Sequence, residues 1–416
     1  MAVFTPFQGF RPRAELASQV ACRPYDVLSS AEAREEAKGN PYTFLHVDKA
    51  EIDLPEGVDL YDDRVYAQAR KNLDRLIAQG VLVQDDTDCF YIYRQHMDGR
   101  VQTGLVGCCT VDDYLKDIIR KHEHTRADKE RDRVRHVDEC DANVGLVFLT
   151  YRSQARLDQI VELWTESRAP IYDFESGGVR HQFWALDEAK VQAEVTACFA
   201  KVRNLYVADG HHRSASAAIV GERRRAANTG HSGDEEYNRF LAVCFPSEHL
   251  HIMDYNRLVK DLGGRTPAQF LTDLEAAFTV EPAGGRGEPC QPQARGQVGL
   301  YLEGRWHCLT ARPEVVPADD PVQGLDVAVL QEQVLTRMLG ITDPRTDKRL
   351  DFVGGIRGLA ELERRVDEEG FACAFALHPT SIDDLMAVAD SGQVMPPKST
   401  WFEPKLYSGL VVHRLS

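Results

Sequence analysis

Short apolar runs alternate with segments of helical periodicity along most of the chain. Such alternation is typical of a mixed α/β protein, in which helices pack on a sheet. The clearest local signal is Asp98-Gly99 between two β-type runs, because this dipeptide suits the tight turn of a hairpin. Strands are predicted over 89–97, 100–109, 144–151, 181–186, 204–208 and 240–245, and helices over 62–79, 110–121, 157–166, 187–202 and 214–227.

The pattern changes in the last third of the chain. Residues 281–297 are rich in Gly, Pro, Gln and Arg, which predicts a loop or linker. Residues 299–309 predict a second hairpin, and residues 325–339 predict an amphipathic helix that ends at Gly340. We therefore expect two domains, one spanning 1–260 and a C-terminal α/β domain spanning 261–416.

Composition narrows the class of protein. The chain has 416 residues and a formal net charge of −16, which disfavours nucleic-acid binding because that binding requires cations against phosphates. The sequence shows neither a signal peptide nor an apolar run long enough to span a membrane, so a cytoplasmic protein is expected. Its 10 cysteines lack a CxxC spacing, and we expect most of them to be reduced and packed as small apolar residues.

The most distinctive polar segment is Asp209-Gly210-His211-His212-Arg213, between a predicted strand and a predicted helix. The first turn of a helix presents unpaired amides and a partial positive charge, which together attract anions. Gly210 permits close approach of the backbone, Arg213 can grip a phosphate with two hydrogen bonds, and the histidines add donors. Asp209 is a candidate acid/base group or metal ligand. We interpret the segment as a phosphate site, with an ordinary capped connection as the alternative.

A second candidate is the turn Pro24-Tyr25-Asp26, which precedes a predicted helix. Its carboxylate can act as a general base toward a substrate hydroxyl. The alternative is a turn that only caps the helix.

A third candidate is the polar segment that contains His122, Glu123, His124 and Thr125. It resembles a metal site in composition, but two histidines two residues apart do not share a helix face. Residues 121–136 therefore predict a solvated helix or a mobile loop, with a lid that closes over substrate as the alternative.

A fourth candidate is the proline-rich segment 395–405. Its polar side chains suit a phosphate or carboxylate ligand, and its alternative is a packed loop anchored by Trp401 and Phe402. The candidate substrate-binding residues of this segment are Lys398, Ser399, Thr400, Glu403 and Lys405. P-loop, dinucleotide-binding and α/β-hydrolase motifs do not occur in the sequence.

Taken together, these motifs resemble the widespread uncharacterised bacterial and archaeal family DUF1015. The resemblance covers essentially the whole chain. The residues that carry it are Pro6-Phe7, Arg23 to Val27, Asn40-Pro41 with Phe44 to His46, His122-Glu123 with Thr125, Ala208 to Arg213, and Met395 to Lys405. The family name implies no activity.

The segment 209–213 also resembles the phosphate motif of the ParB/sulfiredoxin superfamily and matches the string used by its free-serine kinases. This resemblance implies a ParB/sulfiredoxin-like core with large insertions, and a C-terminal region whose 395–405 loop returns to the site. It also implies that Asp26 takes the position of a glutamate that acts on the serine hydroxyl. Aspartate is one methylene shorter, and the two motifs lie further apart here than in the kinases.

The resemblance to the kinases implies phosphoryl transfer from ATP or ADP to a small hydroxyl-bearing metabolite, with free serine as the leading acceptor. Gly210 to Arg213 would hold the phosphates, Asp209 would bind Mg²⁺ or orient the hydroxyl, and Asp26 would be the base. The residues that would contact substrate are Tyr25, His122, Glu123 and Thr125, together with the five named for the fourth segment.

Two alternatives to a kinase stay open. One is a phosphatase or nucleotidase that acts on a small phosphate ester, and the other is a non-catalytic sensor of a nucleotide or phosphometabolite. In each case the expected partner is a small molecule rather than a membrane or a nucleic acid. A homodimer is an open alternative for the assembly.

Overall fold

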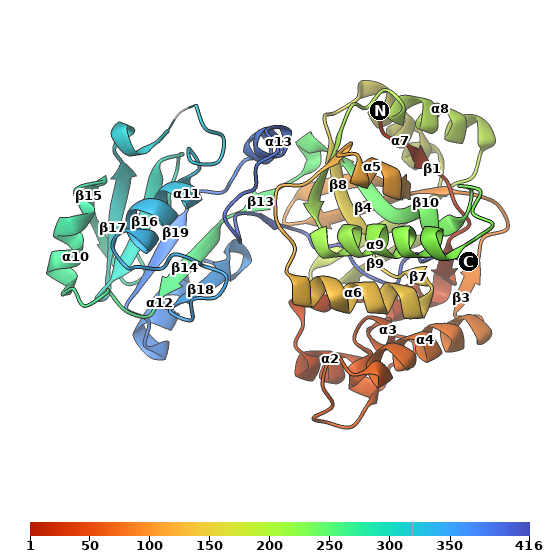
Figure 1. Cartoon of the computed structure of the whole chain (residues 1–416), viewed down its shortest axis with the longest axis horizontal. Helices are drawn as coiled ribbons and strands as arrows, with labels where there is room; N and C mark the ends of the chain where they lie inside the picture. Colours follow the sequence, from red (N-terminus) through yellow and green to blue (C-terminus); the bar gives the residue numbers. More distant parts are fainter. Residues whose placement is uncertain (318) are drawn as a thin grey trace. The chain divides into compact units, whose positions relative to one another are not determined.

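The structure is a computed structural model that describes residues 1–317 and 319–416 (Figure 1). Its internal contacts separate two compact units. Unit 1 consists of residues 1–250 together with 404–416, and unit 2 of residues 251–403. Unit 2 is thus inserted into the chain of unit 1, and the boundary expected near residue 260 falls within unit 2. Both units combine helices with sheets, which confirms the expected mixed α/β class.

A large mixed sheet forms the centre of unit 1. Its strands follow the order β6 (Ile119–Arg120), β11 (Leu205–Asp209), β8 (Val147–Tyr151), β12 (Arg239–Pro246), β5 (Arg100–Thr110), β4 (Phe90–Met97), β10 (Val179–Leu186) and β9 (Tyr172–Ser176), and β1 (Phe4–Thr5) also pairs with β5. β6 runs parallel to β11, and β8 runs parallel to β12. The parallel pairing of β6 with β11 brings the segments that follow these two strands to the same edge of the sheet.

The hairpin of β4 and β5 forms as the sequence predicts. Asp98 and Gly99 have φ values of 50° and 76°, which are the left-handed conformations that a type I′ turn requires. The predicted helix over 110–121 is shorter, because Asp117 adopts a φ of 53° and the next residues join β6. Thr110 still caps the helix by accepting a hydrogen bond from the amide of Asp113.

Helices cover this sheet and its surroundings. The helices of unit 1 are α1 (Ala17–Val20), α2 (Ser30–Ala37), α3 (Leu45–Asp48), α4 (Asp63–Ala78), α5 (Val111–Leu115), α6 (Ala127–Cys140), α7 (Ala155–Ser167), α8 (Ala189–Phe199) and α9 (His211–Ala227). α9 packs beside α6, and α6 beside α4 (Figure 1). The segment 121–136, predicted as a solvated helix or a loop, thus contains most of a packed helix whose residues His136 and Val137 are buried.

Several hydrophobic clusters stabilise unit 1, and two of them are large. The first lies between the sheet and its helices and includes Trp164, Phe199 and Phe240. The second joins α2, α3 and α4 and includes Phe44 and Val412. Val412 belongs to the returning C-terminal segment, which also forms β21 (His413–Arg414) against β7 (Ala142–Asn143). A further ribbon pairs β2 (Phe10–Pro12) with β3 (Leu82–Gln84). The segment 404–416 is therefore an integral part of unit 1.

Unit 2 is built on an antiparallel sheet. Its strands follow the order β15 (Phe278–Gly285), β17 (Arg305–Ala311), β16 (Gln297–Leu302), β19 (Cys373–Leu377), β14 (Tyr255–Val259) and β18 (Leu350–Gly354), and a small ribbon pairs β13 (Ile252–Met253) with β20 (Trp401–Phe402). The helices are α10 (Pro267–Leu274), α11 (Asp326–Leu330), α12 (Leu359–Glu369) and α13 (Ile382–Asp390). The helix predicted over 325–339 is interrupted, because α11 continues as a π-helix over Gln331–Thr336.

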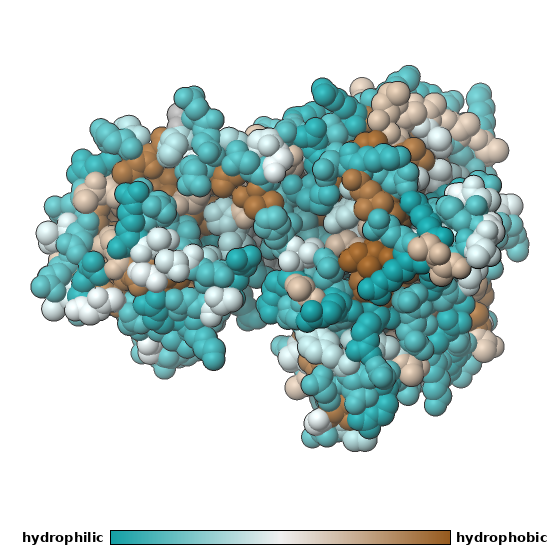
Figure 2. Space-filling model, viewed as in Figure 1, coloured by the Kyte–Doolittle hydropathy of each residue, from teal (hydrophilic) through white to brown (hydrophobic). Residues whose placement is uncertain are grey.

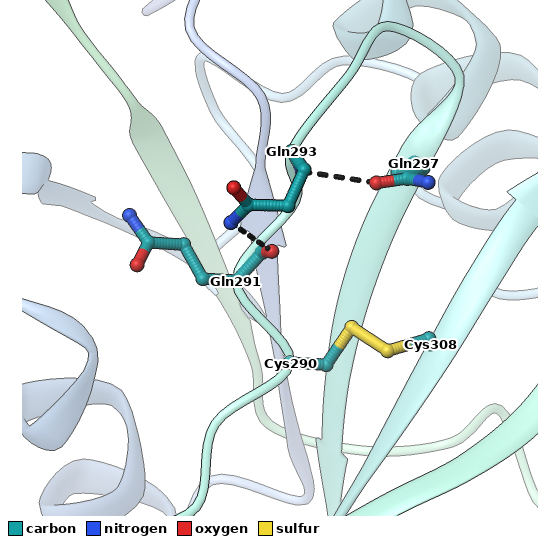
Figure 3. The surroundings of a disulfide bond; sticks show 5 residues. All are labelled: Cys290, Gln291, Gln293, Gln297 and Cys308. Atoms are coloured by element: carbon teal, nitrogen blue, oxygen red, sulfur yellow. Dashed lines mark hydrogen bonds between the residues drawn. A yellow bond between two sulfur atoms is a disulfide. The ribbon is translucent and has the colours of Figure 1, made fainter.

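The segment predicted as a linker, 281–297, contains the end of β15 and one half of a disulfide. Cys290 and Cys308 are joined with a Cα–Cα distance of 5.6 Å (Figure 3). The expectation of reduced cysteines is therefore wrong for this pair. The other cysteines are free and buried, as expected.

The visible surface is mainly polar. Hydrophilic residues cover most of the face of each unit that is visible in Figure 2. Within the described residues, the helices are too short or too polar to span a membrane.

Candidate functional site

The segment that the sequence singles out forms a sharp turn from β11 into α9. Gly210 stands at the N-cap position with φ 87° and ψ 31°, a left-handed conformation that strains any residue with a Cβ. The first hydrogen bond within the helix runs from the amide of Ser214 to the carbonyl of Gly210. The preceding amides of the first turn therefore have no acceptor inside the helix, and their partial positive charge favours an anion.

Arg213 projects from this turn into a partly buried polar cluster. Its Nη2 lies 3.5 Å from Oδ2 of Asp48, whose side chain is fully buried. Oδ2 also accepts a hydrogen bond of 2.5 Å from the hydroxyl of Ser408, whereas Oδ1 receives none from the described residues. The guanidinium also lies 5.0 Å from the centre of the Tyr25 ring. Arg213 thus balances a buried carboxylate in addition to any role toward a ligand.

Gly145 leaves the space that the Arg213 side chain occupies. A Cβ built on Gly145 would lie 1.6 Å from Nη1 of Arg213, so the two cannot coexist. We expect Gly145→Ala to displace the guanidinium and to weaken the affinity of this region for an anion such as inorganic phosphate about tenfold, the effect of losing one charged hydrogen bond. Calorimetry with inorganic phosphate measures this. Gly230→Ala is the matched control, because its Cβ would make only an ordinary contact of 3.6 Å. Equal affinities in the two variants would contradict the prediction.

Asp209, the last residue of β11, is held by two partners. Its Oδ1 accepts a hydrogen bond of 2.7 Å from the Gly210 amide, and its Oδ2 lies 2.9 Å from the ammonium of Lys405. Burial alone would raise the pKa of Asp209, but the charge and hydrogen bond of Lys405, together with the Gly210 amide, lower it to about 2. Asp209 is therefore a carboxylate at neutral pH, and Lys405 is tied to the turn.

The role of Lys405 can be measured directly on Asp209. We expect Lys405→Met to raise the Asp209 pKa, because the effect of burial is then opposed only by the weaker effects of the Gly210 amide and of His211. A pH titration of the carboxyl carbon by NMR measures the shift. Because the native pKa lies below the ordinary one, the ion pair stabilises the fold above about pH 4, and this contribution falls toward pH 2. Lys116→Met, which removes one of the two cations paired with Asp112, is the control and should leave the pKa of Asp209 unchanged.

Asp26 and Tyr25 lie in a short 3-10 helix, Tyr25–Val27, directly before α2. Ser29 caps α2 and forms a capping box with Glu32. The residue of this turn that caps the helix is therefore Ser29 and not Asp26. The Asp26 residue is exposed. Tyr25 packs beneath the guanidinium of Arg133 at 4.1 Å, and burial raises the pKa of its hydroxyl to about 12 against the opposing effect of that cation.

Asp26, Asp209, Gly210 and Arg213 line one small pocket that is open to solvent. All of the lining residues belong to unit 1. They are Pro24, Asp26, Leu146, Phe148, Asp209, Gly210, Arg213, Lys405, Leu406, Tyr407 and Ser408. The structure therefore brings two carboxylates, two cations and the start of α9 to a single cavity.

The two histidines of the turn do not line this pocket. His211 is buried and meets the ring of His122 edge-on, with 4.5 Å between the ring centres. His212 accepts a hydrogen bond of 3.0 Å from the amide of Arg126 through Nε2. Burial lowers the pKa of His122 to about 4 and that of His211 well below its ordinary value, so both imidazoles are neutral.

Other residues of the candidate segments lie elsewhere. Thr125 donates a hydrogen bond of 2.6 Å to Glu130 at the start of α6. Lys398, Ser399, Thr400 and Glu403 belong to unit 2, where Ser399 bonds to Pro396 and Glu403 accepts a hydrogen bond from the Trp401 indole. Of the 395–405 segment, only Lys405 is among the residues that line the pocket.

The sequence did not point to several residues of the site. Asp48 and Gly145 shape the position of Arg213, and Tyr407 and Ser408 complete the wall of the pocket. Asp48 follows the Phe44 to His46 motif by only two residues, and this position could have identified it as a candidate site residue. Gly145 precedes a buried strand and gives no signal of its own.

The fold and pocket define a mixed α/β protein whose cavity is lined by carboxylates, by cationic side chains and by the N-terminus of a helix. The chain belongs to the DUF1015 family, which is described as a protein family of unknown function and whose model matches residues 4–328. No curated protein matches the chain.

Several solved structures resemble the chain at low similarity. One is a conserved hypothetical protein from Pyrococcus furiosus, with 14% identity, coverage of 72% of this chain and 91% of that chain, and a TM-score of 0.33. Another is SbnI with a C-terminal truncation from Staphylococcus aureus, with 10% identity, coverage of 72% and 84%, and a TM-score of 0.39. A third is a free serine kinase variant in complex with AMP, with 11% identity, coverage of 71% and 86%, and a TM-score of 0.35.

Proposed function

We propose that this protein transfers a phosphoryl group from ATP or ADP to a small hydroxyl-bearing metabolite, with free serine as the first acceptor to test. One observation carries the proposal. The exposed carboxylate of Asp26 shares a pocket with the start of α9 and with the cations Arg213 and Lys405. The pocket thus holds a candidate base for the acceptor and a cationic surface for the phosphates.

The cationic side of the pocket suits phosphate groups for physical reasons. Phosphoryl transfer depends mainly on positioning and on neutralising charge at the phosphate oxygens. Two segments supply that positive charge: the first turn of α9, through its amides and the Arg213 guanidinium, and the C-terminal segment, through the Lys405 ammonium. Gly210 keeps the backbone open for close approach. His211 and His212, predicted as phosphate ligands, are not needed for this arrangement.

The proposed reaction is a single displacement at phosphorus. The acceptor oxygen forms a bond to the terminal phosphorus while the bond from that phosphorus to the nucleotide oxygen breaks. Asp26 accepts the proton of the hydroxyl, and the nucleotide leaves with one phosphate fewer. Asp209, held as a carboxylate by Lys405, would bind Mg²⁺ or orient the hydroxyl.

The oxygen ligands of the pocket fit Mg²⁺ delivered with a nucleotide. Mg²⁺ is usually bound by one or two carboxylates together with phosphate oxygens and water. Asp26 is the proposed base, so Asp209 is the carboxylate of the lining that would offer an oxygen to the ion. When bound, the ion would neutralise charge on the phosphates.

The test follows turnover by phosphorus NMR. Purified protein is incubated with Mg²⁺ and ATP or ADP, with and without serine, and then with a panel of other hydroxyl metabolites. The proposal expects a new phosphomonoester signal that requires the acceptor. If no acceptor in the panel becomes phosphorylated, the kinase proposal fails.

Hydrolysis is the second candidate function. The exposure of Asp26 favours it, because a solvated carboxylate can activate water as readily as a metabolite hydroxyl. In the same experiment, release of inorganic phosphate without an acceptor identifies a phosphatase or nucleotidase. Thermal stabilisation by nucleotide without any turnover identifies a sensor.

A further inference from the structure

Three side chains of the types that bind metal ions lie close together at the start of α9, outside the pocket lining. His122 and Glu123 come from the segment after β6, and His211 is the first residue of α9. Each residue offers one ligand atom, and these atoms all lie within 4.8 Å of one another. The parallel pairing of β6 with β11 explains the meeting, because both segments leave the same edge of the sheet. The sequence could not show it, since it directs attention to the pair His122 and His124.

The burial of the two imidazoles needs an explanation. His122 is 1% exposed and His211 is 7% exposed. Nε2 of His211 is buried and has no hydrogen-bond partner among the described residues, which is a costly state for a polar atom. A bound cation would satisfy it.

The surroundings resemble those of known metal ligands. His122 makes a hydrogen bond to the backbone of Val207. A metal-bound histidine typically uses its second ring nitrogen in this way, which fixes the orientation of the ring. The nearby cation Lys121 pairs with Asp117 at 2.6 Å, so an acidic partner balances its charge.

We propose that His122, Glu123 and His211 bind a divalent transition-metal ion, with Zn²⁺ as the probe. Two imidazoles and one carboxylate form a ligand set that suits Zn²⁺ and its first-row neighbours, whereas Mg²⁺ prefers oxygen ligands. Three protein ligands leave a coordination position for water or for a phosphate oxygen. The site is distinct from the Asp26 and Asp209 carboxylates, and it does not depend on the proposed phosphoryl transfer.

The test measures metal binding without any nucleotide. The full chain is treated with chelator, dialysed, and titrated with Zn²⁺ by calorimetry, with metal content checked by mass spectrometry. We expect one high-affinity Zn²⁺ per chain that millimolar Mg²⁺ does not displace. Co²⁺ in place of Zn²⁺ should give visible absorption bands of nitrogen and oxygen coordination.

Variants show whether these residues hold the ion. His122→Ala and Glu123→Gln should each weaken Zn²⁺ binding about 100-fold or more. Glu123 is only partly buried, so its variant keeps the test valid if His122→Ala fails to fold. His124→Ala is the matched control, because this exposed histidine lies in the same segment outside the cluster. If Glu123→Gln and His124→Ala both bind Zn²⁺ as the native protein does, or if the native protein takes up none, the inference is overturned. Loss of kinase activity with intact Zn²⁺ binding would count only against the proposed function.

Discussion

Replacing Asp26 with Asn is expected to lower kcat for phosphoryl transfer by at least about 100-fold, the usual effect of removing a general base. Asparagine has almost the same shape but cannot accept the proton of the acceptor hydroxyl. Because Asp26 is exposed, the fold should not change. Initial rates by phosphorus NMR and nucleotide affinity by calorimetry provide the two measurements, and the affinity should change by less than about twofold.

The control for this prediction is another exposed carboxylate nearby. Glu35 lies on α2, is not part of the pocket lining and makes only a loose ion pair of 3.6 Å with Lys38. Glu35→Gln should leave both kcat and affinity unchanged. If Asp26→Asn retains full activity, the carboxylate is not the base.

Arg213→Ala is expected to have two effects at once. It should abolish detectable nucleotide binding, because the guanidinium is the cation that the first turn of α9 contributes to the pocket. It should also lower the free energy of unfolding by about 3 kcal/mol, because it leaves the buried Asp48 carboxylate without its ion-pair partner. Calorimetry and urea denaturation measure the two effects separately.

A double variant separates binding from stability. In Asp48→Asn with Arg213→Ala, the buried negative charge is removed together with its partner, so most of the lost stability should return. Nucleotide binding should not return. Asp48→Asn alone should still bind nucleotide, because Arg213 is then present. Binding by the double variant at native affinity would show that Arg213 does not contact the phosphates.

The local features of the fold could be predicted from the sequence because their causes are local. The Asp98-Gly99 turn sets the hairpin of β4 and β5, and the apolar run before Asp209 gives β11. Helix α4 has the expected bounds within a residue and is followed by Gly80 with a φ of 65°. In each case, a few adjacent residues determine the backbone conformation.

The features that depend on distant partners could not be predicted. Helix α5 stops early because the following residues pair with β11, a strand far along the chain. The disulfide of Cys290 and Cys308 requires a spatial approach that spacing does not show. At the site, the proposed pairing of Asp26 with the 209–213 turn came from the resemblance to the kinases. The supporting roles of Asp48 and Gly145 come only from packing around Arg213.

The insertion of unit 2 between residues 250 and 404 has a consequence for synthesis of the protein on the ribosome. Residues 404–408 supply part of the pocket wall, and Ser408 bonds to the buried Asp48. These residues are translated after the whole of unit 2. While unit 2 is emerging, the nascent unit 1 therefore exposes an incomplete pocket and lacks Val412 in its second hydrophobic cluster. The wall of the pocket is therefore complete only after this late segment has left the exit tunnel.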